Sequence, residues 1–205
     1  MTSEKYAQNW LTKSQWNKLR KAPDKKDYSR GDIEMKSWRD ELLLKTTYRG
    51  ALRINETLSL KFPYDYETEE DRGFVIVRTS KTKDKAEQQA VGEDIVRDTK
   101  RFISAFHEED TNYIFTDGRG NTITRQRAYQ IMNELGDIVD INKKLGTHTL
   151  RRSRAKHLLD SGKMDLSEVS RFLRHKKLAT TMDYLNFAKK SLAKKAKKID
   201  KELNL

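Results

Sequence analysis

Segments with apolar residues at helical spacing recur along the chain, and several begin at a residue that can cap a helix. Thr12, with Gln15 three residues later, forms a capping-box pattern that satisfies two backbone N–H groups. Trp16 and Leu19 then fall on one face, and Pro23 is expected to end this helix. The same reasoning predicts helices over residues 34–45, 53–60, 95–106, 124–139, 150–161, 165–174 and 180–188, with residues 191–205 able to form one more.

One run has the composition of a β-strand. Residues 73–79 read Gly-Phe-Val-Ile-Val-Arg-Thr, which is rich in β-branched side chains. The polar, lysine-rich residues 80–85 predict a tight turn, and residues 88–91 predict the returning strand. Residues 113–115 form a further short extended segment before a turn at 117–120. The expected fold class is therefore α+β, mostly α-helical with one small antiparallel β-sheet.

The charge balance points to a polyanionic partner. The 205 residues carry 43 Lys and Arg against 31 Asp and Glu, a formal net charge of +12. Such a surplus favours nucleic acid, because each neutralised phosphate releases counterions. RNA-binding proteins share this balance, so charge alone does not indicate DNA. A membrane-surface protein would need a strong amphipathic helix with bulky apolar residues, and the sequence has no convincing one.

Several classes of site and location are excluded. The chain has no cysteine, which excludes disulfides, thiol nucleophiles and cysteine-based zinc sites. The first ten residues have no apolar signal-peptide region, and no stretch approaches 18 apolar residues, so no membrane span is predicted. The sequence also has no obvious acidic cluster for Mg²⁺. We expect no metal and no cofactor.

Two motifs in the second half carry candidate chemistry. His148-x-x-Arg151 follows Gly146-Thr147, which predicts a turn leading into a helix whose first N–H groups could hold an anion. Alone, this pattern is also typical of a capped, solvated helix start. Downstream, Leu173-Arg174-His175 is followed by Thr180-Thr181 and, nine residues after His175, by Tyr184.

Together these residues, over positions 146–188, resemble the signature of the tyrosine recombinases, also called phage-type integrases. Residues 50–60 resemble the segment that supplies the family's first catalytic arginine, which is Arg53 here. Residues 80–85 resemble the hairpin with the catalytic lysine, assigned to Lys81 with Lys83 as its competitor. The resemblance covers roughly residues 10–190 and implies a tyrosine recombinase catalytic-domain fold, with the family's archaeal and archaeal-virus members as the suggested type.

The chain departs from the family pattern at four positions. Ala51 and Ser80 stand where glycine is usual, Arg152 replaces a frequent histidine, and Arg174 replaces the glycine before His175. None of these departures removes a functional side chain.

The resemblance implies a DNA strand-exchange enzyme that works without metal or ATP. Tyr184 would attack a DNA phosphate and form a 3′-phosphotyrosyl intermediate, which keeps the bond energy. Arg53 and Arg151 would pair with the nonbridging oxygens, and His175 would donate to them as well. Viral genome integration is one outcome of such chemistry. The resemblance also implies a cytoplasmic, nucleoid-associated location, or the host cytoplasm for a viral protein.

Two further residues would handle protons. Lys81 would protonate the leaving 5′ oxygen, and His148 would take or return the tyrosine proton. Each site residue also has a bland alternative when taken alone: Arg53 as a surface charge, Lys81 as a loop lysine, and Tyr184 as a residue packing on Leu178.

Other residues have expected supporting roles. Glu56 would hold Arg53 through an i,i+3 interaction, and His157 is interpreted as structural. Contacts to the DNA backbone are expected from the basic residues Lys83, Arg152, Arg154 and Lys156.

The expected organisation is a short extension at 1–10, a catalytic domain at 11–188 and a basic helix or tail at 189–205. The partner is double-stranded DNA, with a homo-tetramer on synapsed DNA and a monomer possible in solution. Integrases usually carry an N-terminal helical domain, and about ten residues precede the catalytic domain here. A fragment, a split integrase gene or a minimal recombinase would each explain this, with weaker and more salt-sensitive DNA binding.

Two alternative functions stay open. A type IB topoisomerase shares the constellation but relaxes supercoils by nicking and resealing DNA. A catalytically silent DNA-binding module would keep the fold and form no covalent adduct.

Overall fold

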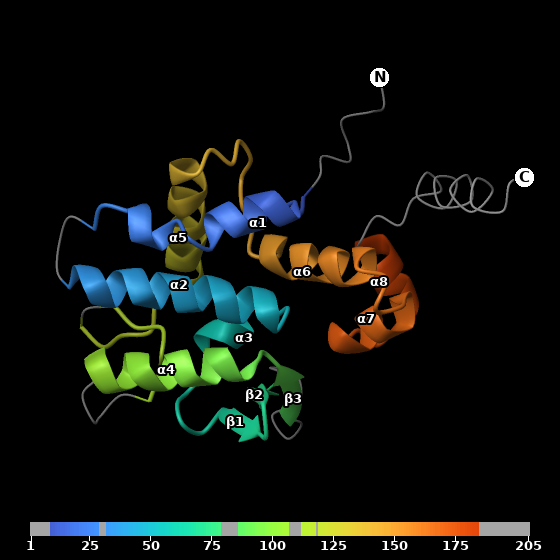
Figure 1. Ribbon diagram of the computed structural model, residues 1–205, viewed down its shortest axis with the longest axis horizontal. Helices are drawn as coiled ribbons and strands as arrows, with labels where there is room; N and C mark the ends of the chain where they lie inside the picture. The colour runs from blue at the N-terminus through green and yellow to red at the C-terminus, as the bar shows by residue number, and fades with distance from the viewer. Residues whose placement is uncertain (1–8, 29–31, 79–85, 107–111, 118, 185–205) are drawn as a thin grey trace, which may run out of the picture. The chain divides into compact units, whose positions relative to one another are not determined.

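The computed structural model describes residues 9–28, 32–78, 86–106, 112–117 and 119–184, which fall into two compact units (Figure 1). The first unit ends at His157 and the second begins at Leu158, so the domain predicted for residues 11–188 spans both. The elements of the first unit are α1 (Lys13–Leu19), η2 (Pro23–Lys25), α2 (Ile33–Arg49), α3 (Ile54–Leu58), β1 (Tyr66–Glu69), β2 (Arg72–Arg78), β3 (Ala86–Ala90), α4 (Glu93–Phe106), α5 (Arg125–Ile138) and most of α6 (Thr149–Asp160). The predicted fold class, mostly α-helical with one small antiparallel sheet, is confirmed.

Helix α1 begins where the sequence predicts and ends earlier. The Thr12 side chain accepts from the Gln15 backbone and the Gln15 side chain accepts from the Thr12 backbone, so the capping box is confirmed. The expectation that Pro23 ends this helix is wrong, because α1 stops at Leu19 and Pro23 instead opens the 3-10 helix η2. Proline suits that place because its fixed φ and missing N–H are tolerated in a first turn.

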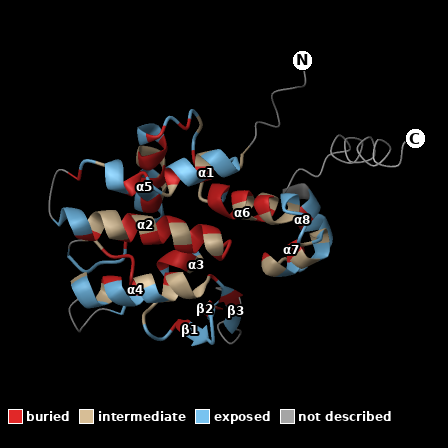
Figure 2. Ribbon diagram, viewed as in Figure 1, coloured by how far each residue is buried: buried red, intermediate tan, exposed pale blue. Residues whose placement is uncertain are grey.

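Helix α2 lies at the centre of the first unit. It is longer than predicted, from its Asp32 cap to Arg49. The consecutive residues Leu42, Leu43 and Leu44 are all buried, so α2 is covered on more than one side. Figure 2 shows buried residues along α2, α3 and α5. On one side α4 packs against α2, where Trp38 meets Phe102 edge to face at 6.1 Å.

The sheet has three antiparallel strands in the order β1-β2-β3. Strand β2 pairs Val75 with Tyr66 of β1 and with Gln89 of β3, and alternate β2 residues are buried. Sequence reasoning missed β1, because only Tyr66 of its four residues is buried and no alternation is visible. At the end of the sheet, a Cβ on Gly73 would lie 2.3 Å from the Gly92 carbonyl oxygen, so this close approach requires glycine.

The second unit contains the end of α6 followed by α7 (Leu166–Phe172) and α8 (Leu178–Tyr184). Asp165 and Glu168 form a capping box at the start of α7. The predicted helix at 180–188 begins two residues earlier, and its part beyond residue 184 lies outside the described residues, as does the predicted tail at 189–205. Of the helices described, none has both the length and the apolar character that crossing a bilayer requires.

Candidate active site

Arg53 sits at the entrance of α3, immediately after a sharp turn from α2. Ala51 in that turn has a φ of 45°, in the left-handed region that favours glycine. The Arg53 backbone N–H and its guanidinium both donate to the Glu56 carboxylate, at 2.7 and 2.6 Å. The predicted contact between Arg53 and Glu56 is therefore confirmed, and it holds a side chain that is still 42% exposed.

Arg151 lies in the first turn of α6, and its side chain is held by the Ala51 turn that precedes Arg53. Its side chain is buried, and its Nη1 donates to the Ala51 carbonyl oxygen at 2.6 Å. A hydrogen bond from a charged group contributes about 1.5–3 kcal/mol. Ala51, with its left-handed backbone, thus links the two arginines that are predicted to bind phosphate. It precedes Arg53 by two residues, and its carbonyl oxygen accepts from Arg151.

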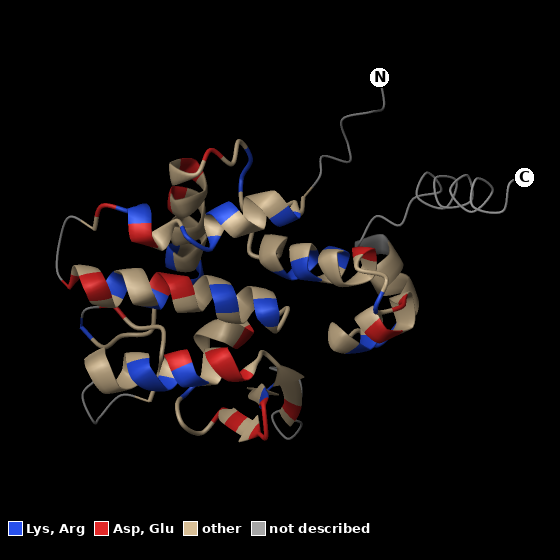
Figure 3. Ribbon diagram, viewed as in Figure 1, with Lys and Arg blue, Asp and Glu red and all other residues tan. Residues whose placement is uncertain are grey.

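His148 lies just before α6 among several arginines. The pKa of His148 is lowered below its ordinary value of 6.5. Partial burial is the largest cause, and the positive charges of four arginines come next: Arg152, Arg151, Arg53 and Arg125. We call His148 and these four arginines the arginine cluster. Figure 3 shows how basic residues gather along α6. A lowered pKa keeps the imidazole neutral near pH 7, the form that can accept a proton.

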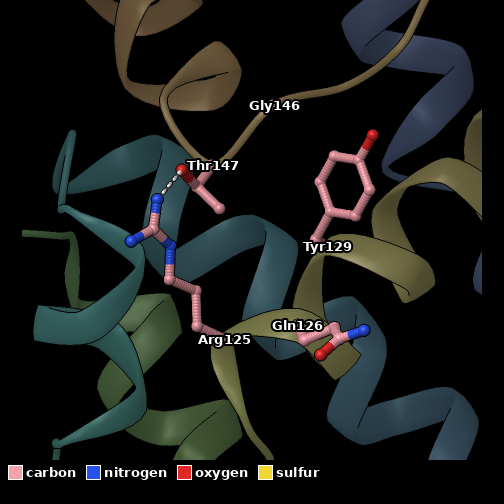
Figure 4. Close-up of a pocket in the computed structure, with 5 residues that line it drawn as sticks. All are labelled: Arg125, Gln126, Tyr129, Gly146 and Thr147. Carbon is pink, nitrogen blue, oxygen red and sulfur yellow. Dashed lines mark hydrogen bonds between the residues drawn. The ribbon is translucent and has the colours of Figure 1, made fainter.

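Arg125 is a member of this cluster that sequence reasoning did not single out. It is the first residue of α5, after the predicted cap Thr124, and its Nη2 donates to the Thr147 hydroxyl at 3.3 Å. Figure 4 shows Arg125 reaching Thr147 beside a pocket of about 510 Å³, lined by Arg125, Gln126, Tyr129, Gly146 and Thr147. The signal available in the sequence was the basic first turn after Thr124, with Arg125 and Arg127.

The second unit holds the other two principal candidates. His175 lies in the connection between α7 and α8, and its Nδ1 is 2.8 Å from the hydroxyl oxygen of Thr181. Tyr184 is the last residue of α8, and its side chain lies outside the described part of the chain. Arg174, where the family pattern has glycine, has a φ of 54°, again in the left-handed region.

The remaining candidates are less directly placed. Lys81 and Lys83 lie outside the described residues. The guanidinium of Arg154 lies over the ring of Tyr48, 5.5 Å from its centre, and burial lowers the pKa of Arg154. The roles of Arg154 and Lys156 in binding DNA stay predictions.

His157 is a buried structural residue, as predicted. Its Nδ1 is 2.6 Å from the Tyr48 hydroxyl, and its Nε2 is 2.9 Å from the Leu11 carbonyl oxygen. Among the described residues, no three acidic or histidine side chains are grouped as a metal site would require.

A family model and several curated proteins match this chain. The model described as the phage integrase family matches residues 9–191. "Tyrosine recombinase XerD" of Staphylococcus epidermidis is 28% identical over 164 residues, 77% of this chain and 53% of that protein. XerD of Staphylococcus haemolyticus is also 28% identical, over 157 residues, 74% of this chain and 51% of that protein. The chain thus spans about half the length of the curated relatives it matches.

Solved structures share the fold. XerH site-specific recombinase bound to palindromic difH substrate, in a post-cleavage complex, superposes with a TM-score of 0.76 at 23% identity, over 91% of this chain and 52% of that one. XerA recombinase gives a TM-score of 0.74 at 19% identity, over 97% of this chain and 66% of that one. A lambda integrase dimer bound to a COC′ core site gives a TM-score of 0.63 at 13% identity, over 86% of this chain and 47% of that one.

Proposed function

The chain belongs to the phage integrase family, and we propose that it is the catalytic part of a site-specific tyrosine recombinase. In this proposal it cleaves and rejoins double-stranded DNA through a 3′-phosphotyrosyl intermediate. The observation that carries the proposal is the arginine cluster, in which Arg53 is held by Glu56, Arg151 is held by the Ala51 carbonyl, and both act on the charge state of His148.

The arginine cluster suits a phosphodiester in its transition state. Negative charge builds up on the nonbridging oxygens, and planar guanidinium groups pair with such oxygens while staying ionised. Arg53 is fixed by Glu56 and Arg151 by the Ala51 carbonyl, so both are preorganised before DNA binds. One preorganised donor of this kind is worth about 3 kcal/mol or more of transition-state stabilisation.

The remaining steps are assigned by family resemblance. Tyr184 attacks phosphorus, the bond to the 5′ oxygen breaks, and Lys81 gives that oxygen its proton. His148 accepts the tyrosine proton, a role supported by its lowered pKa. His175 donates to the same phosphate oxygens.

Binding of duplex DNA is supported by the net charge of +12 and by the DNA named in the structures of XerH and lambda integrase. In this proposal four copies assemble on two synapsed duplexes, at the nucleoid of a cell or on viral DNA in its host. Lys83, Arg152, Arg154 and Lys156 contact the DNA backbone, and Arg125 joins them through its place in the arginine cluster.

The test is covalent capture of the intermediate. A binding sequence is first selected from random DNA and then built into a nicked suicide substrate. We expect the wild-type chain to form a covalent protein–DNA adduct and Tyr184→Phe to form none, because the phenol oxygen is the nucleophile. Tyr64→Phe is the matched control, since Tyr64 is 65% exposed on the first unit and should leave the adduct yield unchanged.

Absence of any adduct with the selected site would overturn the enzymatic proposal in favour of a silent DNA-binding module. Relaxation of a supercoiled plasmid by the wild type, without pairing of sites, would instead favour the topoisomerase alternative.

A further inference from the structure

Three side chains of the second unit form a continuous hydrogen-bonded series, which we call the hydroxyl relay. The hydroxyl of Thr181 on α8 is 2.9 Å from the hydroxyl of Ser170 on α7, and it is also 2.8 Å from Nδ1 of His175. Thr181 and Ser170 are both buried. A buried hydroxyl group that is hydrogen-bonded on two sides, like that of Thr181, donates to one partner and accepts from the other.

The tautomer of His175 follows from the direction of the hydrogen bond between the two hydroxyl groups, in which Thr181 donates to Ser170. A threonine hydroxyl has one hydrogen to donate and two lone pairs. With that hydrogen directed at Ser170, the Thr181 oxygen can only accept from the imidazole, so the proton must reside on Nδ1 of His175. The reverse direction, from Ser170 through Thr181 to the ring, would place the proton on Nε2 instead.

We propose that Thr181, with Ser170, is a positioning residue that keeps a proton on Nδ1 of His175 and assigns Nε2 to the scissile phosphate. This inference rests on the proposed function. With the first proton on Nδ1, Nε2 donates to a phosphate oxygen after it takes up a second proton from solvent, so the ring that contacts the phosphate is an imidazolium. Its hydrogen bond to the phosphate then joins an ionised donor to an ionised acceptor.

The relay also connects the phosphate donor to the helix of the nucleophile. Thr181 precedes Tyr184 by three residues on α8, while His175 lies outside that helix. The orientation of the imidazole is therefore set by the same helix that carries Tyr184. Because neither hydroxyl touches the reacting atoms in this proposal, both act through His175.

The first experiment reads the tautomer without any DNA. The full chain, labelled with ¹⁵N at its four histidines, is measured by long-range ¹H–¹⁵N NMR at a pH where the rings are neutral. His175→Gln assigns the resonance. We expect the Nδ1–H form in the wild type and in Thr181→Ser, and a gain of the Nε2–H form in Thr181→Val.

Ser170→Ala is the sharper variant, and it decides the matter if Thr181→Val fails to fold. Without its acceptor, the Thr181 proton is redirected to the ring, so His175 should convert to the Nε2–H form. An Nε2–H signal in the wild type, or an unchanged Nδ1–H signal in Ser170→Ala, would overturn the proposal.

The second experiment is single-turnover cleavage of the suicide substrate at saturating protein. Thr181→Val should slow cleavage by about 10-fold or more while the Kd for DNA changes by less than about twofold, because the lost contribution is made in the transition state. Thr181→Ser should restore the rate, and Thr180→Val, at an exposed neighbour on α8, is the matched control. Wild-type protein that forms no adduct contradicts the proposed function. Wild-type cleavage that Thr181→Val leaves unchanged contradicts only the relay.

Discussion

At the scale of the residue, two backbone positions show what departures from a family pattern mean physically. Ala51 and Arg174 stand where the resembling pattern has glycine, and both have a left-handed φ, 45° and 54°. A side chain in this region costs about 1–2 kcal/mol. Glycine would avoid that cost, so the left-handed backbone explains why the family pattern has glycine at both positions. At Ala51 the same conformation brings its carbonyl to Arg151.

The electrostatics of His148 lead to a prediction at this scale. A lowered pKa in the folded state means that the fold favours the neutral ring. This contribution to stability is present above the ordinary pKa of 6.5 and is lost as the pH falls below it. Arg152→Gln should raise the pKa of His148 toward its ordinary value, since after burial the charge of Arg152 contributes most to lowering that pKa.

An NMR titration of the His148 ring protons measures this shift. Arg97→Gln is the control, because Arg97 is engaged with Glu93 on α4 and is not among the charges that act on His148. A wild-type pKa at or above the ordinary value, or one that Arg152→Gln leaves unmoved, would refute the electrostatic account.

At the scale of the element, α6 is hydrogen-bonded to the segment that precedes α1. The Ser153 hydroxyl accepts from the Leu11 N–H at 2.8 Å and donates to the Thr149 carbonyl at 2.7 Å. The Leu11 carbonyl can only accept, so His157 donates to it through Nε2, and Nδ1 accepts from Tyr48. Both backbone groups of Leu11 are thus bound by the helix that carries Arg151.

This contact predicts a specific loss of stability. Ser153→Ala leaves the buried N–H of Leu11 without its acceptor, which should lower the free energy of unfolding by about 1–3 kcal/mol. Denaturant unfolding of the variant and the wild type measures the difference. Ser104→Ala, at an exposed position on α4, should stay within about 0.5 kcal/mol of the wild type. An equally small effect of Ser153→Ala would mean that the Leu11 contact contributes little.

Local signals predicted the elements well where the relevant contacts are local. The caps at Thr12 and Thr124 were visible in the sequence, because a cap involves residues only three apart. Strand β1 was not visible, because its pairing with β2 is tertiary and three of its four residues are exposed. The early end of α1 was missed for a different reason: a proline predicts a helix stop, whereas Pro23 is the first residue of the 3-10 helix that follows.

At the scale of the whole molecule, the net charge of +12 predicts DNA binding that depends strongly on salt. A protein that neutralises about six phosphates loses about 1,000-fold in affinity between about 50 and 200 mM salt. Fluorescence anisotropy with a labelled duplex gives the slope of log affinity against log salt. Arg125→Gln should reduce that slope by about one, as expected for one phosphate contact, and Arg97→Gln should leave it unchanged. A shallow wild-type slope would contradict this prediction.

The site was only partly predictable because its parts are distant in the chain. Family spacing led to Arg53, His148 and Arg151, and the structure places these three in one electrostatic environment. Nothing in the spacing indicated Arg125, whose contact with Thr147 spans 22 positions. The Ser170 hydroxyl was equally hidden, since a serine on an amphipathic helix has no sequence mark that distinguishes a relay from an ordinary polar residue.

The Ala51 turn has a consequence for protein engineering. One backbone carbonyl, rather than a charged side chain, joins the loop that leads to Arg53 with the guanidinium of Arg151. Directed evolution could therefore tune both arginines together by altering the flexibility of residues 50–52, leaving every charge in place. In the proposed recombinase, libraries at these positions would alter the placement of the Arg151 guanidinium without changing any charged side chain.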